Sequence, residues 1–235
     1  MSSEQELLGA TGAYTAYGRA IESERSDALF HDQFAKAFAG TLGKEFMQSV
    51  STSCQIVEAQ LCTAVAVRVN LFDDLLLKTA PQQVVILACG GDMRHCRLPF
   101  SETCQFYEVD LPNVMKHRQH VTGSSFTGPN IHPISCDLNE STTLEKELIA
   151  AGFNCKVPAT WLCEGLVMYL PETKLKEMLQ LIVKLSAPGS HFIADFLNKK
   201  YHSSDWTKAL REVWARYGMN PCFGTDAPER LLAQV

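Results

Sequence analysis

The sequence lacks the features of secreted, membrane-spanning and nucleic-acid-binding proteins. No apolar run approaches the ~20 residues of a membrane-spanning helix, and the N-terminal segment MSSEQELLGATGAY has neither the basic start nor the apolar stretch of a secretory signal. With 21 Lys and Arg against 26 Asp and Glu, the net charge of −5 supplies no broad basic surface for nucleic acid. We therefore expect a cytoplasmic protein that binds neither membranes nor nucleic acids.

The nine cysteines lack the pairing that a disulfide framework or a zinc site requires. Their number is odd, and no two of them form a C-x-x-C pair. Cys89, Cys136 and Cys163 lie in or beside apolar runs, where a free cysteine behaves as a small core hydrophobe. We expect reduced, unpaired thiols and no bound metal.

The first 80 residues lack short β-type runs and show helical periodicity instead. Apolar side chains recur every three or four positions between Ser26 and Phe46 and again between Gln55 and Leu77. This spacing predicts two amphipathic helices. We expect residues 1–80 to form a helical cap or lid and residues 81–235 to form the core.

After residue 81, short apolar runs alternate with amphipathic stretches. This alternation predicts an α/β fold, namely a Rossmann-like, doubly wound and mostly parallel sheet with right-handed crossovers. The expected strands span residues 84–89, 105–110, 130–137, 160–164 and 191–196, and the expected helices of this half span residues 144–151, 171–186 and 204–217. A last helix is expected near the C-terminus, with Asp226 as N-cap and Glu229 as its capping-box partner.

Four expected strands end in polar or acidic residues. The first runs into Cys89-Gly90-Gly91-Asp92, and the next three end at Asp110, Asp137 and Glu164. An acid in such a place often only caps the following helix, and that explanation stands for any single one. Ligands of open parallel sheets bind outside the carboxyl ends of the strands. Four such positions in succession therefore favour a ligand site.

The glycine turn lacks the third glycine of a dinucleotide-binding loop. In G-x-G-x-x-G that glycine opens a helix whose N-terminus faces a pyrophosphate, and a pyrophosphate here would also meet the negative charge of Asp92. A nicotinamide dehydrogenase is therefore disfavoured. Asp110 follows Gly90 by 20 residues, the spacing at which an acid accepts hydrogen bonds from ribose hydroxyls. S-adenosylmethionine, a nucleoside without phosphate, fits these features better.

Several segments resemble motifs of one family. QQVVILACGGDMRHCRL, FYEVDLPNVMKHR and WLCEGLVMYLPET carry most of the resemblance, and SDALFHDQFAKAFAG and AVAVRVNLFDDLL occur in the right order before them. They resemble the leucine carboxyl methyltransferase family, a group of class I S-adenosylmethionine-dependent methyltransferases that includes bacterial polyketide O-methyltransferases of the TcmP type. The resemblance runs from about Arg19 to Phe196.

The resemblance implies roles along the nucleoside part of S-adenosylmethionine. Gly90 would line the methionyl chain, and Asp110 would bind the ribose hydroxyls. Asp137 and Leu138 would border the adenine.

At the amino-acid end, the resemblance implies that Arg68 pairs with the methionyl carboxylate and that Arg19 is a second basic contact. Glu164 would face the methionyl ammonium. Tyr169, just after the fourth expected strand, is the candidate catalytic residue of the acceptor pocket, although a core tyrosine is the competing explanation. Taken alone, Arg68 would be read as a solvated helix residue.

The sequence also departs from the family. Ala88 replaces the first glycine of the turn, Cys89 replaces a smaller alanine and is expected to narrow the cofactor slot, and Gln33 replaces a proline. The family ends its sheet with a β-hairpin after a GW-type turn, which is missing before Val235. We therefore expect a sheet without its last two strands and with an exposed edge.

The function favoured by these features is an S-adenosylmethionine-dependent O-methyltransferase that releases S-adenosylhomocysteine. A carboxylate or hydroxyl of a small, polyketide-like molecule is favoured as acceptor over a protein. The alternatives are a carboxyl methyltransferase of the C-terminal leucine of a phosphatase catalytic subunit, or an inactive binding module of the same fold. A hydroxyl acceptor would need a base, and no positional argument separates His117, His120 and His202.

Overall fold

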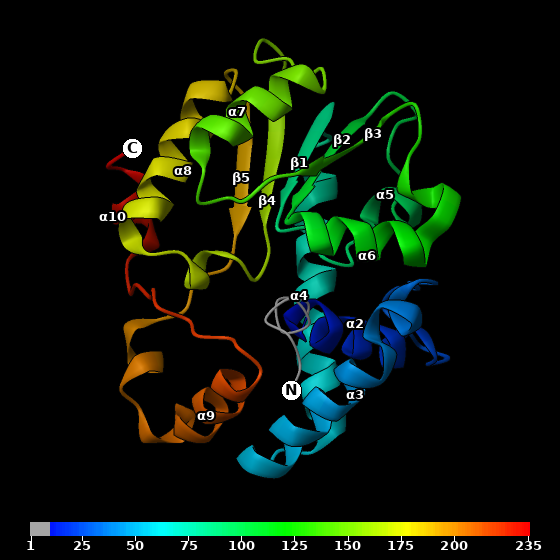
Figure 1. Cartoon of the computed structure of the whole chain (residues 1–235), viewed down its shortest axis with the longest axis vertical. Coiled ribbons are helices and arrows are strands. Elements are labelled where there is room, and N and C mark those ends of the chain that lie inside the picture. Colours follow the sequence, from blue (N-terminus) through cyan, green and yellow to red (C-terminus); the bar gives the residue numbers. More distant parts are fainter. Residues whose placement is uncertain (1–9) are drawn as a thin grey trace.

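The computed structural model describes residues 10–235, so part of the N-terminal segment compared above with a secretory signal lies outside the described residues. At its centre is a parallel sheet in the order β3-β2-β1-β4-β5 (Figure 1). The strands are β1 (Gln83–Leu87), β2 (Gln105–Asp110), β3 (Ile131–Ser135), β4 (Ala159–Cys163) and β5 (His191–Ala194). The α-helices are α2 (Ala10–Ser23), α3 (Ala35–Cys54), α4 (Glu58–Lys78), α5 (Arg94–Arg97), α6 (Pro112–Thr122), α7 (Ser141–Ala150), α8 (Glu172–Leu185), α9 (Lys208–Arg216) and α10 (Pro228–Leu232). Short 3-10 turns are η1 (Gly123–Phe126), η2 (Val167–Tyr169), η3 (Lys199–His202) and η4 (Asp205–Thr207).

The strand order confirms the predicted doubly wound, Rossmann-like α/β fold. The chain winds from β1 towards β3 and then crosses over to β4 and β5, so the switch point lies between β1 and β4. Within residues 10–235 no strand follows β5 in the sheet, which leaves β5 at an edge, as the shortened sheet predicted.

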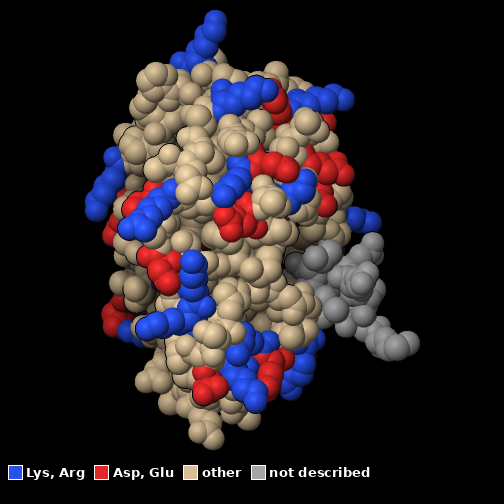
Figure 2. Space-filling model, turned by 90° about the vertical axis from the view of Figure 1, so that its left-hand side faces the viewer, with Lys and Arg blue, Asp and Glu red and all other residues tan. Residues whose placement is uncertain are grey.

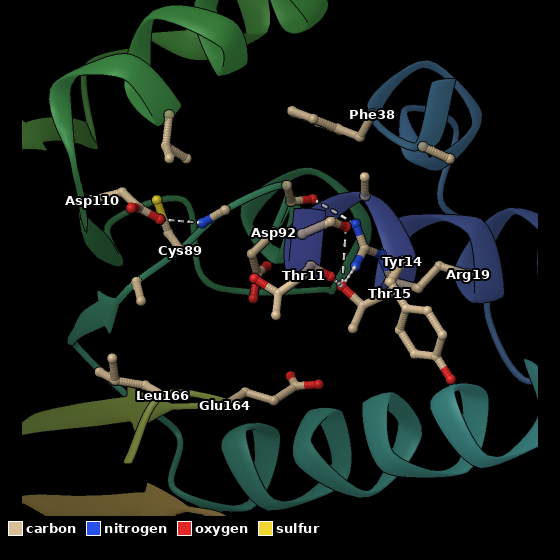
Figure 3. A pocket seen from close by; sticks show the side chains of 18 of the residues that line it. Thr11, Tyr14, Thr15, Arg19, Phe38, Cys89, Asp92, Asp110, Glu164 and Leu166 are labelled. Atoms are coloured by element: carbon tan, nitrogen blue, oxygen red, sulfur yellow. Dashed lines mark hydrogen bonds between the residues drawn. The ribbon is translucent and has the colours of Figure 1, made fainter. Parts of the chain in front are cut away.

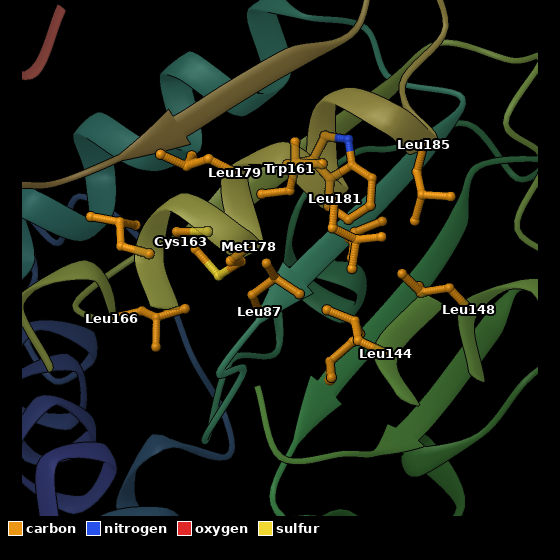
Figure 4. Packing of buried hydrophobic residues seen from close by; sticks show 14 of the residues in the cluster. Leu87, Leu144, Leu148, Trp161, Cys163, Leu166, Met178, Leu179, Leu181 and Leu185 are labelled. Carbon is orange, nitrogen blue, oxygen red and sulfur yellow. The ribbon is translucent and has the colours of Figure 1, made fainter. Parts of the chain in front are cut away.

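The strands next to the switch point are buried on both faces. Val85 and Leu87 pack towards α7 and α8, together with Trp161 of β4, whereas Val84 and Ile86 pack towards α4 and α6. Successive side chains of a strand point to opposite faces, so a strand covered on both sides must be apolar throughout. Figure 4 shows the α8 face, where Trp161 and Leu87 lie among leucine side chains of α7 and α8.

Helices α2, α3 and α9 lie beyond the carboxyl ends of the strands (Figure 1). Helix α2 crosses α3 at close range, since a Cβ on Gly43 would lie 2.3 Å from the carbonyl oxygen of Ala13. Helix α4 connects the two layers. Its first half packs on α2 through Val65, and its second half buries Phe72 and Leu76 against the sheet. Glycines and one long helix thus fix the helical layer over the end of the sheet.

The start of α3 differs from the predicted helix, which began near Ser26. The Asp32 carboxylate accepts hydrogen bonds from the backbone N–H groups of Phe34 and Ala35, both at 3.1 Å. This side chain holds the preceding residues in turns, and the helix begins only at Ala35. Periodicity alone does not detect such a side-chain turn.

The predicted N-cap at Asp226 is wrong. Its Oδ1 accepts a hydrogen bond from the backbone N–H of Lys199 at 3.1 Å instead. Helix α10 begins at Pro228, and Ala227 precedes it without a side-chain cap. The Asp226 side chain therefore fastens the C-terminal segment to the chain after β5.

The nine cysteines are free thiols, as the sequence predicted. Cys89, Cys136 and Cys163 are buried, and burial raises the pKa of each thiol. These side chains therefore act as small core hydrophobes.

Acidic and basic side chains are intermixed on the face shown in Figure 2. That face shows no extended patch of one sign. No single helix between residues 10 and 235 is long and apolar enough to cross a membrane; α3 and α4 reach that length and composition only when counted together, and they meet at 116°.

Candidate active site

A cavity of about 880 Å³ lies between the carboxyl ends of β1, β2 and β4 and the helices α2 and α3 (Figure 3). Its wall also includes the first turns of α6, the segment after β4, Trp214 and residues 218–220. It lies at the switch point of the sheet, the place where open α/β sheets bind ligands. We treat it as the candidate active site.

The glycine turn after β1 forms one wall. Ala88 and Gly90 both have positive φ values, 56° and 48°. Gly91 lets α3 pack closely on the turn, since a Cβ there would lie 2.9 Å from Cγ of Phe38 on α3. The Cys89 side chain packs below the turn, with its Sγ 3.7 Å from Sδ of Met115. Cys89 also lines the cavity, so its narrowing of the cofactor slot stays a prediction.

Asp110 faces the turn from the end of β2. Its Oδ2 accepts a hydrogen bond from the N–H of Gly90 at 2.7 Å, and its Oδ1 accepts one from the N–H of Leu111 at 2.7 Å (Figure 3). The residue is 8% exposed, and burial raises its pKa although both backbone hydrogen bonds oppose this. Each carboxylate oxygen accepts two hydrogen bonds, so each retains capacity towards the cavity.

Glu164 follows β4 and is held by two arginines. Its Oε2 accepts from Nη2 of Arg94 at 2.6 Å, and its Oε1 accepts from Nε of Arg68 at 3.0 Å. Burial alone would raise the pKa of Glu164, but Arg94 and Arg68 hold it below its ordinary value. The structure therefore brings Glu164 and Arg68 together at the cavity as an ionised pair.

Arg94 joins three carboxylates from different parts of the chain. Its Nε donates to Asp73 on α4 at 2.7 Å, its Nη1 donates to Asp92 in the turn, and its Nη2 reaches Glu164. Burial alone would raise the pKa of Asp92, but Arg94 and Arg97 lower it to about 2. Sequence reasoning missed Arg94 and Asp73, although both stand in segments quoted for the resemblance.

Arg19 ties α2 to the glycine turn. Its Nη2 donates to the carbonyl of Gly91 at 2.8 Å, its Nε donates to Asp32 at 2.9 Å, and its Nη1 lies 3.5 Å from Oγ1 of Thr15 (Figure 3). All three guanidinium nitrogens thus have a protein partner. Arg19 lines the cavity, and in this arrangement it fixes the wall; its contact with the cofactor stays a prediction.

The other predicted residues divide into two groups. Tyr169 and His117 line the cavity, whereas His120 and His202 do not. Burial raises the pKa of Tyr169 well above its ordinary value, so its hydroxyl is neutral. Asp137 and Leu138 also lie outside the lining, so contact of this pair with adenine stays a prediction.

One side of the cavity is lined mainly by aromatic and apolar residues. We call it the neutral side: Tyr14, Leu42, Tyr169, Trp214 and Met219 line it and pack into one cluster between α2, α3 and α9. Sequence reasoning placed Trp214 on a helical stripe without connecting it to the site. Within residues 10–235, no group of three or more His, Cys, Asp or Glu side chains is arranged to hold a metal ion.

Relatives of the chain are methyltransferases by name. A candidate S-adenosyl-L-methionine-dependent methyltransferase of Parafrankia is 36% identical over 195 residues, 78% of this chain and 61% of that protein. One of Mycobacterium tuberculosis is 30% identical over 223 residues, 88% of this chain and 71% of that protein. The crystal structure of a candidate methyltransferase from Thermobifida fusca has the same fold, with a TM-score of 0.58 at 14% identity over 81% of this chain and 72% of that chain.

The chain thus spans 61% of the length of its Parafrankia relative and 71% of that of its mycobacterial relative. A sequence profile described as leucine carboxyl methyltransferase matches residues 13–183, which include most of α2, the helices α3 and α4, the glycine turn and the strand ends around the cavity. With most of its length covered by that profile, this protein belongs to the leucine carboxyl methyltransferase family.

Proposed function

We propose that this protein is an S-adenosylmethionine-dependent methyltransferase that methylates an oxygen atom of a small molecule. The observation that carries the proposal is the pairing of Asp110 with the N–H of Gly90 at the wall of a cavity at the switch point. The names of the relatives support the same cofactor. When bound, S-adenosylmethionine supplies an already activated methyl group, and transfer of that group yields S-adenosylhomocysteine.

The Asp110 carboxylate suits a ribose diol. Its two oxygens are oriented by the backbone N–H groups of Gly90 and Leu111, and a carboxylate accepts charge-assisted hydrogen bonds from two hydroxyls at once. Gly90 leaves room for the chain of the ligand, since the nearest atom to a Cβ built there is Cα of Gly12 at 4.0 Å. The residues present therefore fit the nucleoside.

Glu164 and Arg68 suit the zwitterionic end of the methionyl group. The Arg68 side chain is 32% exposed, whereas Glu164 is 13% exposed and fixed by Arg94. We propose that Glu164 receives the ammonium and that Arg68 turns towards the carboxylate. Arg19 acts indirectly in this proposal, because it holds Gly91 in place.

The adenine is proposed to lie beside Asp110, where Leu111, Asn113 and Val114 line the cavity. Asp137 and Leu138 would then border it from the end of β3, as predicted. The helices α2 and α3 would close over the ligand as a lid, which excludes water from the transfer.

The neutral side is the proposed acceptor pocket, with Tyr169 in contact with the acceptor. A carboxylate acceptor is ionised at neutral pH and needs no base, so a neutral tyrosine hydroxyl serves as a hydrogen-bond donor there. A hydroxyl acceptor would need a base, and His117 is the histidine of the three candidates that lines the cavity. Its pKa is lowered by burial and by His120, which favours the unprotonated form that a base requires.

The structure gives a reason to prefer this function to nicotinamide chemistry. Asp92 in the turn is already paired with Arg94, and α5 after the turn has only four residues, so the turn offers a pyrophosphate no long helix N-terminus. The family name favours a carboxylate as the second candidate acceptor, including the C-terminal carboxylate of a protein.

Incubation with methyl-labelled S-adenosylmethionine tests the proposal. The substrates are a panel of small aromatic carboxylates and hydroxyls, together with a peptide ending in the C-terminal leucine of a phosphatase catalytic subunit. We expect label in a small-molecule product, and release of the label by mild base identifies an ester. Label in the peptide alone would overturn the small-molecule proposal. Cofactor binding without transfer to any substrate would indicate an inactive binding module.

A further inference from the structure

Glu164 is contacted by two arginines that differ in freedom. The Arg94 side chain is 3% exposed, and each of its three guanidinium nitrogens faces a different carboxylate. The Arg68 side chain is 32% exposed and approaches Asp195 only at 3.6 Å. A planar fork held at three points cannot rotate away, so Arg94 is the fixed partner of Glu164 and Arg68 is the mobile one.

We infer that Arg94 is a positioning residue that keeps Glu164 charged and aimed at the α-ammonium group of the cofactor. This inference rests on the proposed function, because it assumes that the methionyl end lies at Glu164. When Arg68 turns to the carboxylate of the ligand, Arg94 remains as the cation bound to Glu164.

The local charge explains why the fixed arginine is needed. Asp73, Asp92 and Glu164 all lie within hydrogen-bond distance of the Arg94 guanidinium. Among residues 10–235, the carboxylate paired with Arg97 is Asp73, and Nη2 of Arg97 lies 2.7 Å from Oδ1 of that residue. Without Arg94, Asp92 and Glu164 would face each other in a buried place, and one of them would take up a proton. A protonated Glu164 has no charge to attract an ammonium.

Two ligands that share a nucleoside distinguish a positioning role of Arg94 from a structural one. S-adenosylhomocysteine carries the amino-acid group, whereas 5′-methylthioadenosine has the same ribose and adenine but no ammonium or carboxylate. A residue that acts through Glu164 must matter for the first ligand and not for the second. A residue that only stabilises the fold must affect both alike.

The test measures the affinity of both ligands by calorimetry for the wild type, Arg94→Lys and Arg25→Lys. We expect Arg94→Lys to weaken S-adenosylhomocysteine by about tenfold, since lysine keeps the charge but loses the fork, and to leave 5′-methylthioadenosine within about twofold. The control Arg25→Lys changes an exposed arginine outside the cavity lining that pairs with Asp27 through two nitrogens, and it should change neither affinity by more than about twofold.

The pH dependence of the affinity for S-adenosylhomocysteine distinguishes a positioning role of Arg94 from a purely structural one. In Arg94→Met, we expect the affinity for S-adenosylhomocysteine to rise as the pH rises from 6 to 8, because Glu164 must first lose its proton; the wild type stays flat. If Arg94→Met does not fold, the affinities of the two ligands for Arg94→Lys decide the test. Equal weakening of both ligands by Arg94→Lys, or the same selective loss in Arg25→Lys, would overturn the inference. Failure of the wild type to bind either ligand would instead overturn the proposed function.

Discussion

On the side of the glycine turn, the cavity wall consists of charged side chains that hold one another, whereas the neutral side, between α2, α3 and α9, is aromatic and apolar. Arg94 alone joins three carboxylates on the first side. On the neutral side, Tyr169, Trp214 and Met219 pack through apolar contacts.

This difference suggests that the two sides of the cavity bind different ligands. Ion pairs fix the positions of polar groups before any ligand arrives, which suits one constant, polar cofactor. An apolar wall imposes shape and size with few directional contacts, which suits an acceptor that is recognised by its hydrophobic body. The charged side should therefore be rigid and intolerant of substitution, and the neutral side more tolerant.

The largest expected effect is on stability. Arg94→Met should lower the free energy of unfolding by about 3–5 kcal/mol, because it leaves buried carboxylates without their partner. Tyr169→Phe on the neutral side removes one hydroxyl and should change it by about 1 kcal/mol or less. Urea unfolding followed by circular dichroism measures both. Similar losses in the two variants would remove the contrast between the two sides.

The next effect is on the affinity for S-adenosylhomocysteine. Asp110→Asn should weaken binding by about 10- to 100-fold, since an amide offers only one acceptor oxygen and no charge to the ribose hydroxyls. Calorimetry measures the change. Asp74→Asn, an exposed neighbour of the charged side on α4, is the matched control and should bind as the wild type does. Unchanged affinity in Asp110→Asn would place the ribose elsewhere.

A smaller effect is on the pH dependence of the free energy of unfolding, to which His95 in α5, just after the turn, contributes. Burial alone would lower its pKa, but hydrogen bonds with Cys96 and Glu108 raise it from 6.5 to about 10. The stabilisation is fully present below pH 6.5, the pKa of the unfolded chain, and is lost as the pH rises towards 10. Between pH 7 and 8 the wild type should therefore lose about 1 kcal/mol relative to His95→Gln. The free energy of unfolding is measured by urea titration at each pH. The same pH dependence in the wild type and His95→Gln would show that His95 is not charged.

The smallest effect comes from the turn itself. Ala88 has a φ of 56°, a left-handed conformation that costs a residue with a Cβ about 1–2 kcal/mol. Glycine relieves this strain but gains freedom in the unfolded chain, so Ala88→Gly should stabilise the protein by about 0.5 kcal/mol. The reverse change, Gly152→Ala at a φ of 92° with open space around it, should destabilise it by about 1 kcal/mol. A loss of stability in Ala88→Gly would contradict this explanation.

The charged side was largely predictable from the sequence. Asp110 and Glu164 stand at the ends of apolar runs, and the parallel sheet brings strand ends to one edge, so their meeting at the cavity follows from strand order alone. What could not be predicted is their bonding. Arg94 and Asp73 are visible as letters in the sequence, but a pair 21 positions apart gives no sign of an ion pair until α4 is placed against the turn.

The neutral side was predicted less well, for a physical reason. Apolar and aromatic residues such as Trp214 and Met219 look the same in a sequence whether they fill a core or line a cavity. They also lie after Phe196, where the resemblance to family motifs ends. Only the packing of α9 against α3 shows that Trp214 reaches the cavity.

The most direct test of the account is the titration of S-adenosylhomocysteine into the wild-type protein, with NAD as the comparison ligand. We expect saturable binding of one S-adenosylhomocysteine per chain, with a dissociation constant below about 1 mM, the weak end of ordinary enzyme–substrate affinities, and no binding of NAD. A folded protein that binds NAD, or that gives neither heat nor a thermal shift with S-adenosylhomocysteine, would contradict it.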